Sequence, residues 1–154
     1  MSSDSFSFAM GEFTAKFPAD RMYARNHMWA LQTTRGRWRF GLTAYAVRLL
    51  QDVYFLEWTF EPDTSIAARQ LIGAIESKKA ESDLYAPIAG VLVAINDACL
   101  ADPSIINADT YGDGWLFEME SEEVDLLLSP DDYRAHLVEA WEIAQRTIKG
   151  QANT

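Results

Sequence analysis

The chain has 154 residues, of which 49% are hydrophobic and 23% charged, a composition that predicts one globular domain with a sizeable core. No apolar stretch approaches the roughly 20 residues that cross a bilayer, and the N-terminus lacks a signal-peptide pattern, so we expect a cytoplasmic protein without a membrane partner. The single cysteine, Cys99, excludes an internal disulfide framework.

The charge is unevenly distributed along the chain. Residues 1–40 carry six Lys or Arg against three Asp or Glu, whereas residues 41–154 carry seven against twenty, in agreement with a net charge of −10. Such an acidic main body repels phosphate backbones, so we expect no nucleic-acid partner. The acidic residues form either a solubilising surface or a docking face for a basic protein.

Residues 1–20 are predicted to form an N-terminal extension, followed by a main domain over 21–128 and a C-terminal helix over 129–150. The extension is Ser-rich at its start and ends in Phe17-Pro18-Ala19-Asp20, which favours a tail. Its four phenylalanines argue against full disorder.

The main domain is predicted to begin with a β-hairpin over residues 28–42, with its turn at 33–36. Thr43 is then placed to act as the N-cap of a short helix over 44–50. Alternating apolar residues predict the next strand at 53–58.

Two similar apolar segments, 71–77 and 91–97, flank a lysine pair, Lys78 and Lys79. Two such strand units joined by a hairpin predict two small sheets packed face to face, related by approximate two-fold symmetry, with the lysines at the hairpin tip. A further alternating strand is predicted at 115–120.

The C-terminal segment has the pattern of a capped helix. Ser129 is placed as the N-cap, Pro130 is at the first helical position, and Asp132 follows three residues after the cap. Gly150 is predicted to end the helix. Residues at helical spacing predict a face that packs on the domain: Tyr133, Leu137, Trp141, Ala144 and Ile148.

No catalytic constellation is visible in the sequence. Neither His27 nor His136 has a partner at metal-ligand spacing, and Cys99 has no neighbouring histidine. The Gly112-x-Gly114 pair lacks the third glycine and the following helix of a dinucleotide site. The residues therefore indicate no catalytic site, and we expect no bound metal.

The lysine hairpin resembles the lipoylation hairpin of glycine-cleavage H proteins. Residues 76–90 read ESKKAESDLYAPIAG, and the family pattern is E-S-V-K-A-x-S-D-x-x-A/S-P-x-S-G. Roughly residues 23–145 are covered by the resemblance. Its other blocks are YARNHMW at 23–29 (family Y-x-x-x-H-E-W), FGLTAYA at 40–46 (G-I-T-x-x-A), DVYFLE at 52–57 (D-V-V-F-V-E) and INADTYGDGW at 106–115 (V-N-x-x-P-Y-G-x-G-W).

The resemblance implies a mainly β, flattened lipoyl-type β-sandwich (a barrel-sandwich hybrid) with a short helix after the first hairpin and a C-terminal helix. It implies a carrier with lipoate amide-linked to Lys79, because Lys78 occupies the family's valine position. Methionines usually flank a biotinyl lysine, and here they are absent, which disfavours biotin. Residues implied in ligase recognition or arm contacts are Glu76, Asp83, Gly90, Asn26, His27 and Met28.

The departures from the family pattern concern the cleft in which the family holds an aminomethyl-loaded arm. Met28 replaces the glutamate of H-E-W, Asn26 replaces a serine, and Asp63 replaces a glycine, whereas Asp83 is retained. A thioether is a poor substitute for a carboxylate beside an ammonium cargo.

The departures favour a divergent relative, similar to the lipoate-binding proteins that accompany heterodisulfide-reductase-like complexes in bacterial sulfur oxidation. Such a carrier would shuttle sulfur-bound intermediates or electrons, with a lipoate ligase and that complex as partners. The alternative is a glycine cleavage system H protein that serves glycine decarboxylase, aminomethyltransferase and dihydrolipoyl dehydrogenase. A lipoate-relay protein or a non-carrier scaffold is the third possibility.

Overall fold

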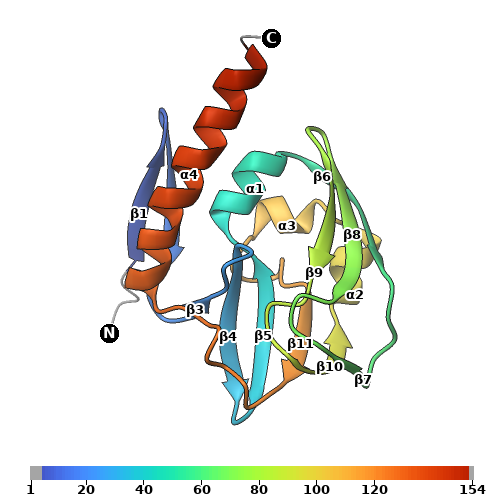
Figure 1. The fold of residues 1–154 in the computed structure, drawn as a ribbon. Helices are drawn as coiled ribbons and strands as arrows, with labels where there is room; N and C mark the ends of the chain where they lie inside the picture. The colour runs from blue at the N-terminus through green and yellow to red at the C-terminus, as the bar shows by residue number, and fades with distance from the viewer. Residues whose placement is uncertain (1–4, 153–154) are drawn as a thin grey trace.

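The computed structural model describes residues 5–152, and side chains as far as residue 146. It is mainly β (Figure 1). The strands are β1 (Ser5–Met10), β2 (Phe13–Pro18), β3 (Met22–Tyr23), β4 (Met28–Thr34), β5 (Arg37–Leu42), β6 (Val53–Trp58), β7 (Thr64–Ile66), β8 (Leu71–Ser77), β9 (Glu81–Tyr85), β10 (Gly90–Ile95) and β11 (Phe117–Glu120). The helices are α1 (Ala44–Leu50), α2 (Asp97–Ala101), α3 (Ile105–Ala108) and α4 (Pro130–Ala152).

Two antiparallel sheets form the body of the molecule. One has the strand order β3-β4-β5-β11-β10-β7, and the other has the order β6-β8-β9. The two similar segments of the sequence lie in different sheets, β8 in the smaller and β10 in the larger. The prediction that a hairpin joins them is wrong, because the lysine hairpin joins β8 to β9, which lies between the two segments in the sequence. The lipoyl-type sandwich predicted from the sequence is confirmed, while its approximate two-fold symmetry stays a prediction.

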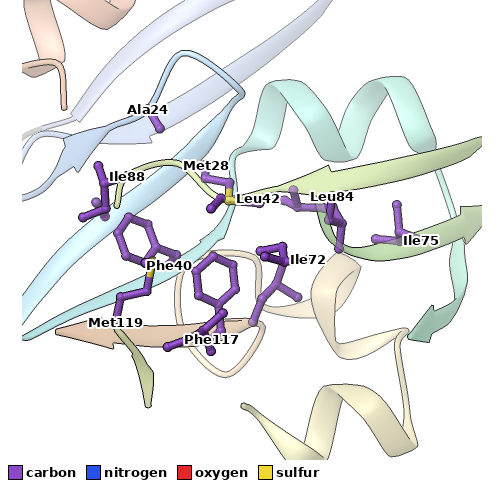
Figure 2. Packing of buried hydrophobic residues seen from close by; sticks show 14 of the residues in the cluster. Ala24, Met28, Phe40, Leu42, Ile72, Ile75, Leu84, Ile88, Phe117 and Met119 are labelled. Carbon is purple, nitrogen blue, oxygen red and sulfur yellow. The ribbon is translucent and has the colours of Figure 1, made fainter. Parts of the chain in front are cut away.

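The core lies between the two sheets (Figure 2). Strand β8 contributes Ile72 and Ile75, which both point inward because the β-bulge between Leu71 and Gly73 interrupts the alternation of side chains along the strand. The cross-strand neighbours Phe40 and Phe117 stack with ring centroids 5.2 Å apart. Because both inner faces are apolar, the sheets fix the relative positions of every loop that the strands carry.

The first hairpin and the short helix form as predicted. Strands β4 and β5 pair, and the Thr43 hydroxyl accepts a hydrogen bond from the Ala46 N–H (3.5 Å) at the start of α1. Helix α1 is capped at its C-terminus by Gln51, which follows Leu50 and has a left-handed φ of 63°. The Gln51 N–H donates to the Val47 carbonyl (2.8 Å).

The N-terminal extension is a β-hairpin, so the expectation of a tail is wrong for residues 5–18. Strands β1 and β2 pair antiparallel with Phe6 opposite Phe17, and Gly11 provides the left-handed turn residue. The rings of Phe6 and Phe17 stack at 4.9 Å, and both are buried in a second hydrophobic cluster. Burial of alternate phenylalanines holds this segment on the body; the domain boundary at residue 21 stays a prediction.

Helix α4 packs against this N-terminal hairpin (Figure 1). The predicted cap is confirmed, since the Ser129 hydroxyl accepts from the Asp132 N–H (3.1 Å). Tyr133 and Leu137 are fully buried, and Trp141 is half-buried against the Tyr45 ring.

The predicted end of α4 at Gly150 is wrong, because the helix continues to Ala152. A glycine inside a helix costs only about 1 kcal/mol relative to alanine, which does not force termination. The predicted core position of Ile148 lies outside the residues whose side chains are described. Within residues 5–152, none of the helices has both the length and the apolar character that a bilayer crossing requires.

Candidate functional site

The lysine pair lies at the tip of the β8–β9 hairpin, and both lysines are exposed. Ser77 closes the turn: its N–H donates to the Ala80 carbonyl (2.9 Å), and its hydroxyl accepts from the N–H groups of Lys79 (3.3 Å) and Ala80 (3.2 Å). The Lys78 N–H donates to the Asp52 carbonyl (2.8 Å) before β6. A serine suits this position because its hydroxyl satisfies N–H groups that a tight turn leaves unpaired. The tip therefore presents two free lysine side chains on a fixed backbone.

The outer face of the β6-β8-β9 sheet is acidic next to this tip. Glu76 and Glu81 lie directly opposite each other, with Glu57 nearby. The pKa of Glu76 is raised because its carboxyl hydrogen-bonds the Glu81 carboxyl, with desolvation and the repulsion from Glu81 and Glu57 adding to the shift. The Glu76 carboxyl therefore binds a proton more readily than an isolated glutamate would.

A cleft of about 330 Å³ lies on the other side of the hairpin, between β9, α1 and the start of β4. We call it the α1 cleft. Its walls are mostly apolar, and its polar groups lie toward β9. The lining residues include Met28, Tyr45, Leu50, Ala80, Glu81 and Asp83. Because Ala80 follows Lys79 directly, the cleft begins beside the lysine tip.

The structure brings four of the predicted site residues together in this cleft: Asn26, His27, Met28 and Asp83. The Asn26 side-chain amide donates to the Tyr85 carbonyl (2.9 Å), which ties the segment before β4 to the end of β9. Met28 is 1% exposed, so its side chain is part of the core beneath the cleft. Asp83 is exposed and accepts a hydrogen bond from the Tyr85 hydroxyl (3.3 Å).

Glu76 and Gly90 lie outside the α1 cleft. Glu76 is on the acidic outer face, three residues before Lys79. Gly90 begins β10, where a Cβ atom would lie 2.5 Å from the Glu120 carbonyl oxygen. This close approach gives Gly90 a packing role that is independent of any ligase.

His27 belongs to a buried network that sequence reasoning did not find. Its Nδ1 atom lies 2.8 Å from the Tyr133 hydroxyl, which in turn lies 2.9 Å from the Thr43 hydroxyl. The His136 ring stacks on the His27 ring, with the ring centroids 5.2 Å apart. Burial, with a smaller effect of His136, lowers the pKa of His27 to about 4. His27 is therefore neutral near pH 7.

Burial also raises the pKa of Tyr133 well above its ordinary value, so the phenol keeps its proton. Tyr133 is 106 residues away from His27 along the chain. Nothing in the local pattern of either residue could indicate their contact. The helical stripe of α4 predicted that Tyr133 is buried, but not that its hydroxyl fixes a residue of the cleft.

Comparisons with known proteins agree with this architecture. The family model described as "Glycine cleavage H-protein" matches residues 21–140. The glycine cleavage system H protein of Psychrobacter cryohalolentis is 41% identical over 128 residues, covering 80% of this chain and 99% of the relative. That of Shewanella frigidimarina is 39% identical over 120 residues, covering 76% and 92%. A crystal structure of the H protein from Mycobacterium marinum superposes with a TM-score of 0.69 at 35% identity, covering 77% of this chain and 97% of that one.

H proteins of this family are carriers rather than catalysts, and they hold lipoate covalently on a lysine. The match extends over most of the chain and includes the lysine hairpin, the α1 cleft and the first part of α4. The chain belongs to the glycine cleavage H-protein family.

Proposed function

We propose that Lys79 carries the lipoyl group and that the protein shuttles the aminomethyl group of glycine between the enzymes of a glycine cleavage system. The observation that carries this proposal is the position of Lys79 at a fixed hairpin tip beside a mostly apolar cleft. The names of the similar proteins support glycine cleavage over sulfur oxidation. The partners would be a lipoate ligase, glycine decarboxylase, aminomethyltransferase and dihydrolipoyl dehydrogenase.

The residues around the tip fit a lipoyl group. The exposed Lys79 amine is accessible to a modifying enzyme, and the apolar walls of the α1 cleft suit a hydrocarbon chain with a disulfide ring. When bound, lipoate supplies a disulfide that opens to take up a cargo and a thiol that releases it. Tethering the group to the tip raises its local concentration at any docked enzyme.

The chain's own residues would hold the cargo end. Glu81 and Asp83 place carboxylates along the β9 side of the cleft, where they can accept hydrogen bonds from an ammonium group. The Asn26 carboxamide oxygen offers a further acceptor nearby. Burial of Tyr45 and Met28 keeps water from the cleft floor, which strengthens these contacts.

Lys79 is assigned over Lys78 on its alignment with the family lysine and on the spacing from Glu76. The test incubates the wild type, Lys78→Ala and Lys79→Ala with a lipoate ligase and reads intact masses. We expect the lipoyl mass on the wild type and on Lys78→Ala only. A lipoyl adduct on Lys79→Ala would overturn the assignment. A wild-type protein that no ligase modifies would instead support the third possibility, a scaffold protein that carries no lipoate.

The cargo is tested with the lipoylated protein and glycine decarboxylase, by glycine-dependent exchange of labelled bicarbonate. We expect exchange that depends on the lipoylated protein and that Asp83→Asn weakens. The Glu57→Gln variant is a matched control, because Glu57 lies on the outer face of the sheet and not in the α1 cleft. Exchange no faster than with the unlipoylated protein would contradict an aminomethyl cargo.

Met28 is the observation that favours a second candidate, a carrier of sulfur-bound intermediates or electrons for a heterodisulfide-reductase-like complex. Its buried thioether occupies a position where the family has a carboxylate, and it offers an ammonium no charge. If the cargo contains sulfur, wild-type exchange should be slow and Met28→Glu should raise it. If the cargo is aminomethyl, Met28→Glu should add little, because Glu81 and Asp83 already line the cleft.

A further inference from the structure

A second pocket, of about 400 Å³, adjoins the α1 cleft and shares Asn26 and Tyr85 with it. We call it the arginine pocket, because its charged lining residues are Arg25 and Arg69. Apart from the two shared residues, the rest of the lining is apolar and includes Pro87 and Leu126, and none of the described residues that line the pocket is a carboxylate. The combined groove is therefore polarised, with carboxylates beside the lysine tip and guanidinium groups beyond the end of β9.

Neither of these arginine side chains makes an ion pair or a hydrogen bond within the part of the chain that the structure describes. By contrast, Arg37 and Arg39 hold Glu118, and Arg134 lies over the Phe6 ring. Both arginines are exposed, so the pocket offers two positive charges to an occupant from solution. The pocket therefore favours a negatively charged occupant, even in a chain with a net charge of −10.

The backbone of Arg69 supports a role for its side chain. Its φ of 68° lies in the left-handed region, which glycine adopts freely and residues with a Cβ adopt rarely. An arginine at a position that glycine would occupy without strain points to a function of the guanidinium. The conformation is held by the Arg69 N–H, which donates to the Ala86 carbonyl (2.9 Å).

The backbone of Arg25 is fixed as well. Its carbonyl accepts a hydrogen bond from Nε2 of His136 (2.8 Å), a residue of α4. Asn26 uses one amide N–H for the Tyr85 carbonyl, which leaves its second N–H able to donate into the shared part of the groove. The backbones of Arg25 and Arg69 and the Asn26 amide are therefore held in place before binding, which lowers the entropy cost of binding.

We propose that the arginine pocket is a binding site for a small oxyanion: a carboxylate, sulfonate or phosphate group. A guanidinium presents paired N–H donors that match two oxygens of such a group, and two guanidinium groups can hold it from two sides. The oxyanion is either free in solution or the terminal group of a cargo on the lipoyl arm, and this second source rests on the function proposed above.

Binding of free anion is tested on unlipoylated Lys79→Ala protein, which keeps the pocket and removes the arm. Inorganic phosphate is titrated against chloride at constant ionic strength, and backbone amide shifts are followed by NMR. We expect saturable shifts at Arg25, Asn26 and Arg69. A hydrogen bond to a charged group contributes about 1.5–3 kcal/mol, so removing the arginines should weaken binding by about tenfold or more.

The variant for this comparison is Arg25→Gln combined with Arg69→Gly, because glycine suits the left-handed backbone at position 69 and preserves the fold. Arg146→Gln, an exposed arginine on α4, is the matched control and should bind phosphate as the parent does. Shifts that do not saturate, or an affinity unchanged in the double variant, would overturn the proposed site.

The two sources are separated with lipoylated wild-type protein, reduced and alkylated with either iodoacetate or iodoacetamide. The two caps have nearly the same size and differ in charge. If the anion comes on the arm, the carboxymethyl cap should shift the amides of Arg25 and Arg69 and the carbamidomethyl cap should not. If the anion is free, both caps should leave these amides unchanged while phosphate still binds. Because the phosphate titration needs no lipoate, it decides the site even if Lys79 proves not to be lipoylated.

Discussion

Replacing Leu137 by alanine tests whether α4 and the N-terminal hairpin form a true second core. Leu137 is fully buried in the cluster that contains Phe6, Phe17 and Tyr133. Truncating a buried leucine costs about 2–5 kcal/mol, because apolar contacts are lost and a cavity remains. For a domain of this size, 1 kcal/mol corresponds to roughly 2–4 °C, so a mid-range loss of about 3 kcal/mol should lower the Tm by roughly 6–12 °C.

The assay is thermal and urea unfolding at pH 7, with Val138→Ala as the matched control. Val138 is the next residue of the same helix and is 56% exposed, so its truncation should change the free energy of unfolding by less than about 0.5 kcal/mol. Equal midpoints for Leu137→Ala and Val138→Ala would show that α4 is not packed on the body in solution, and the burial described for it would then be refuted.

Three further predictions concern the hairpin, the cleft and the sheet contact. Phe17→Ala should lower the free energy of unfolding by about 3–5 kcal/mol in urea, and a change near zero would mean that the N-terminal hairpin is not docked. The pKa of His27 falls from its ordinary 6.5 to about 4 on folding, so the unfolded chain binds this proton first and stability should fall as the pH drops from 6.5 to 4. His27→Asn, which tolerates the left-handed backbone, should show a shallower fall in the urea midpoint over that window, and equal slopes would contradict the assignment. Gly90→Ala should lower the Tm by several degrees, because overpacking costs about 1–3 kcal/mol, and an unchanged Tm would show that the Glu120 carbonyl can move away.

Local signals were read correctly where one residue and its near neighbours determine the outcome. Thr43 and Ser129 were identified as helix caps, and both hydroxyls accept the expected N–H groups. The strands β4, β5, β6 and β8 form where their own β-prone segments predict them, although β-bulges interrupt the regular pairing of β4–β5, β6–β8 and β8–β9. A cap or a strand pattern is contained within a few residues, so the sequence alone is sufficient.

Other features depend on partners that the local pattern does not reveal. The Ser-rich start has the pattern of a tail because its phenylalanines gain burial only after folding, against Tyr23 and against α4 at the other end of the chain. The contact of His27 with Tyr133 likewise arises only after the chain has folded. The short helix α2 was missed although Asn96 is its N-cap, because five residues give too few turns for a helical periodicity.

For the candidate site, the family pattern singles out Asn26, His27, Met28 and Asp83, and the fold brings these four residues to one cleft beside the lysine tip, while their contacts with a lipoyl arm stay a prediction. No sequence pattern indicates the arginine pocket, because Arg25 and Arg69 are far apart in the sequence and match no motif. The pocket is defined by the backbone conformation of Arg69 and by the residues that line both pockets. These are properties of the folded chain only.

For the carrier function proposed above, in which the tip would meet several enzymes in turn, the hydrogen bonds of Ser77 and Lys78 have an energetic consequence. Fixing one disordered residue costs about 1–2 kcal/mol in conformational entropy. If the tip were disordered, its binding free energy would therefore be weakened by several kcal/mol at each encounter. Here that loss has already occurred during folding, because the turn and its link to Asp52 are formed in the free protein. An enzyme can therefore capture the tip through a small contact area and still release it quickly. Brief, repeated visits between successive enzymes are what such a stiff tip permits.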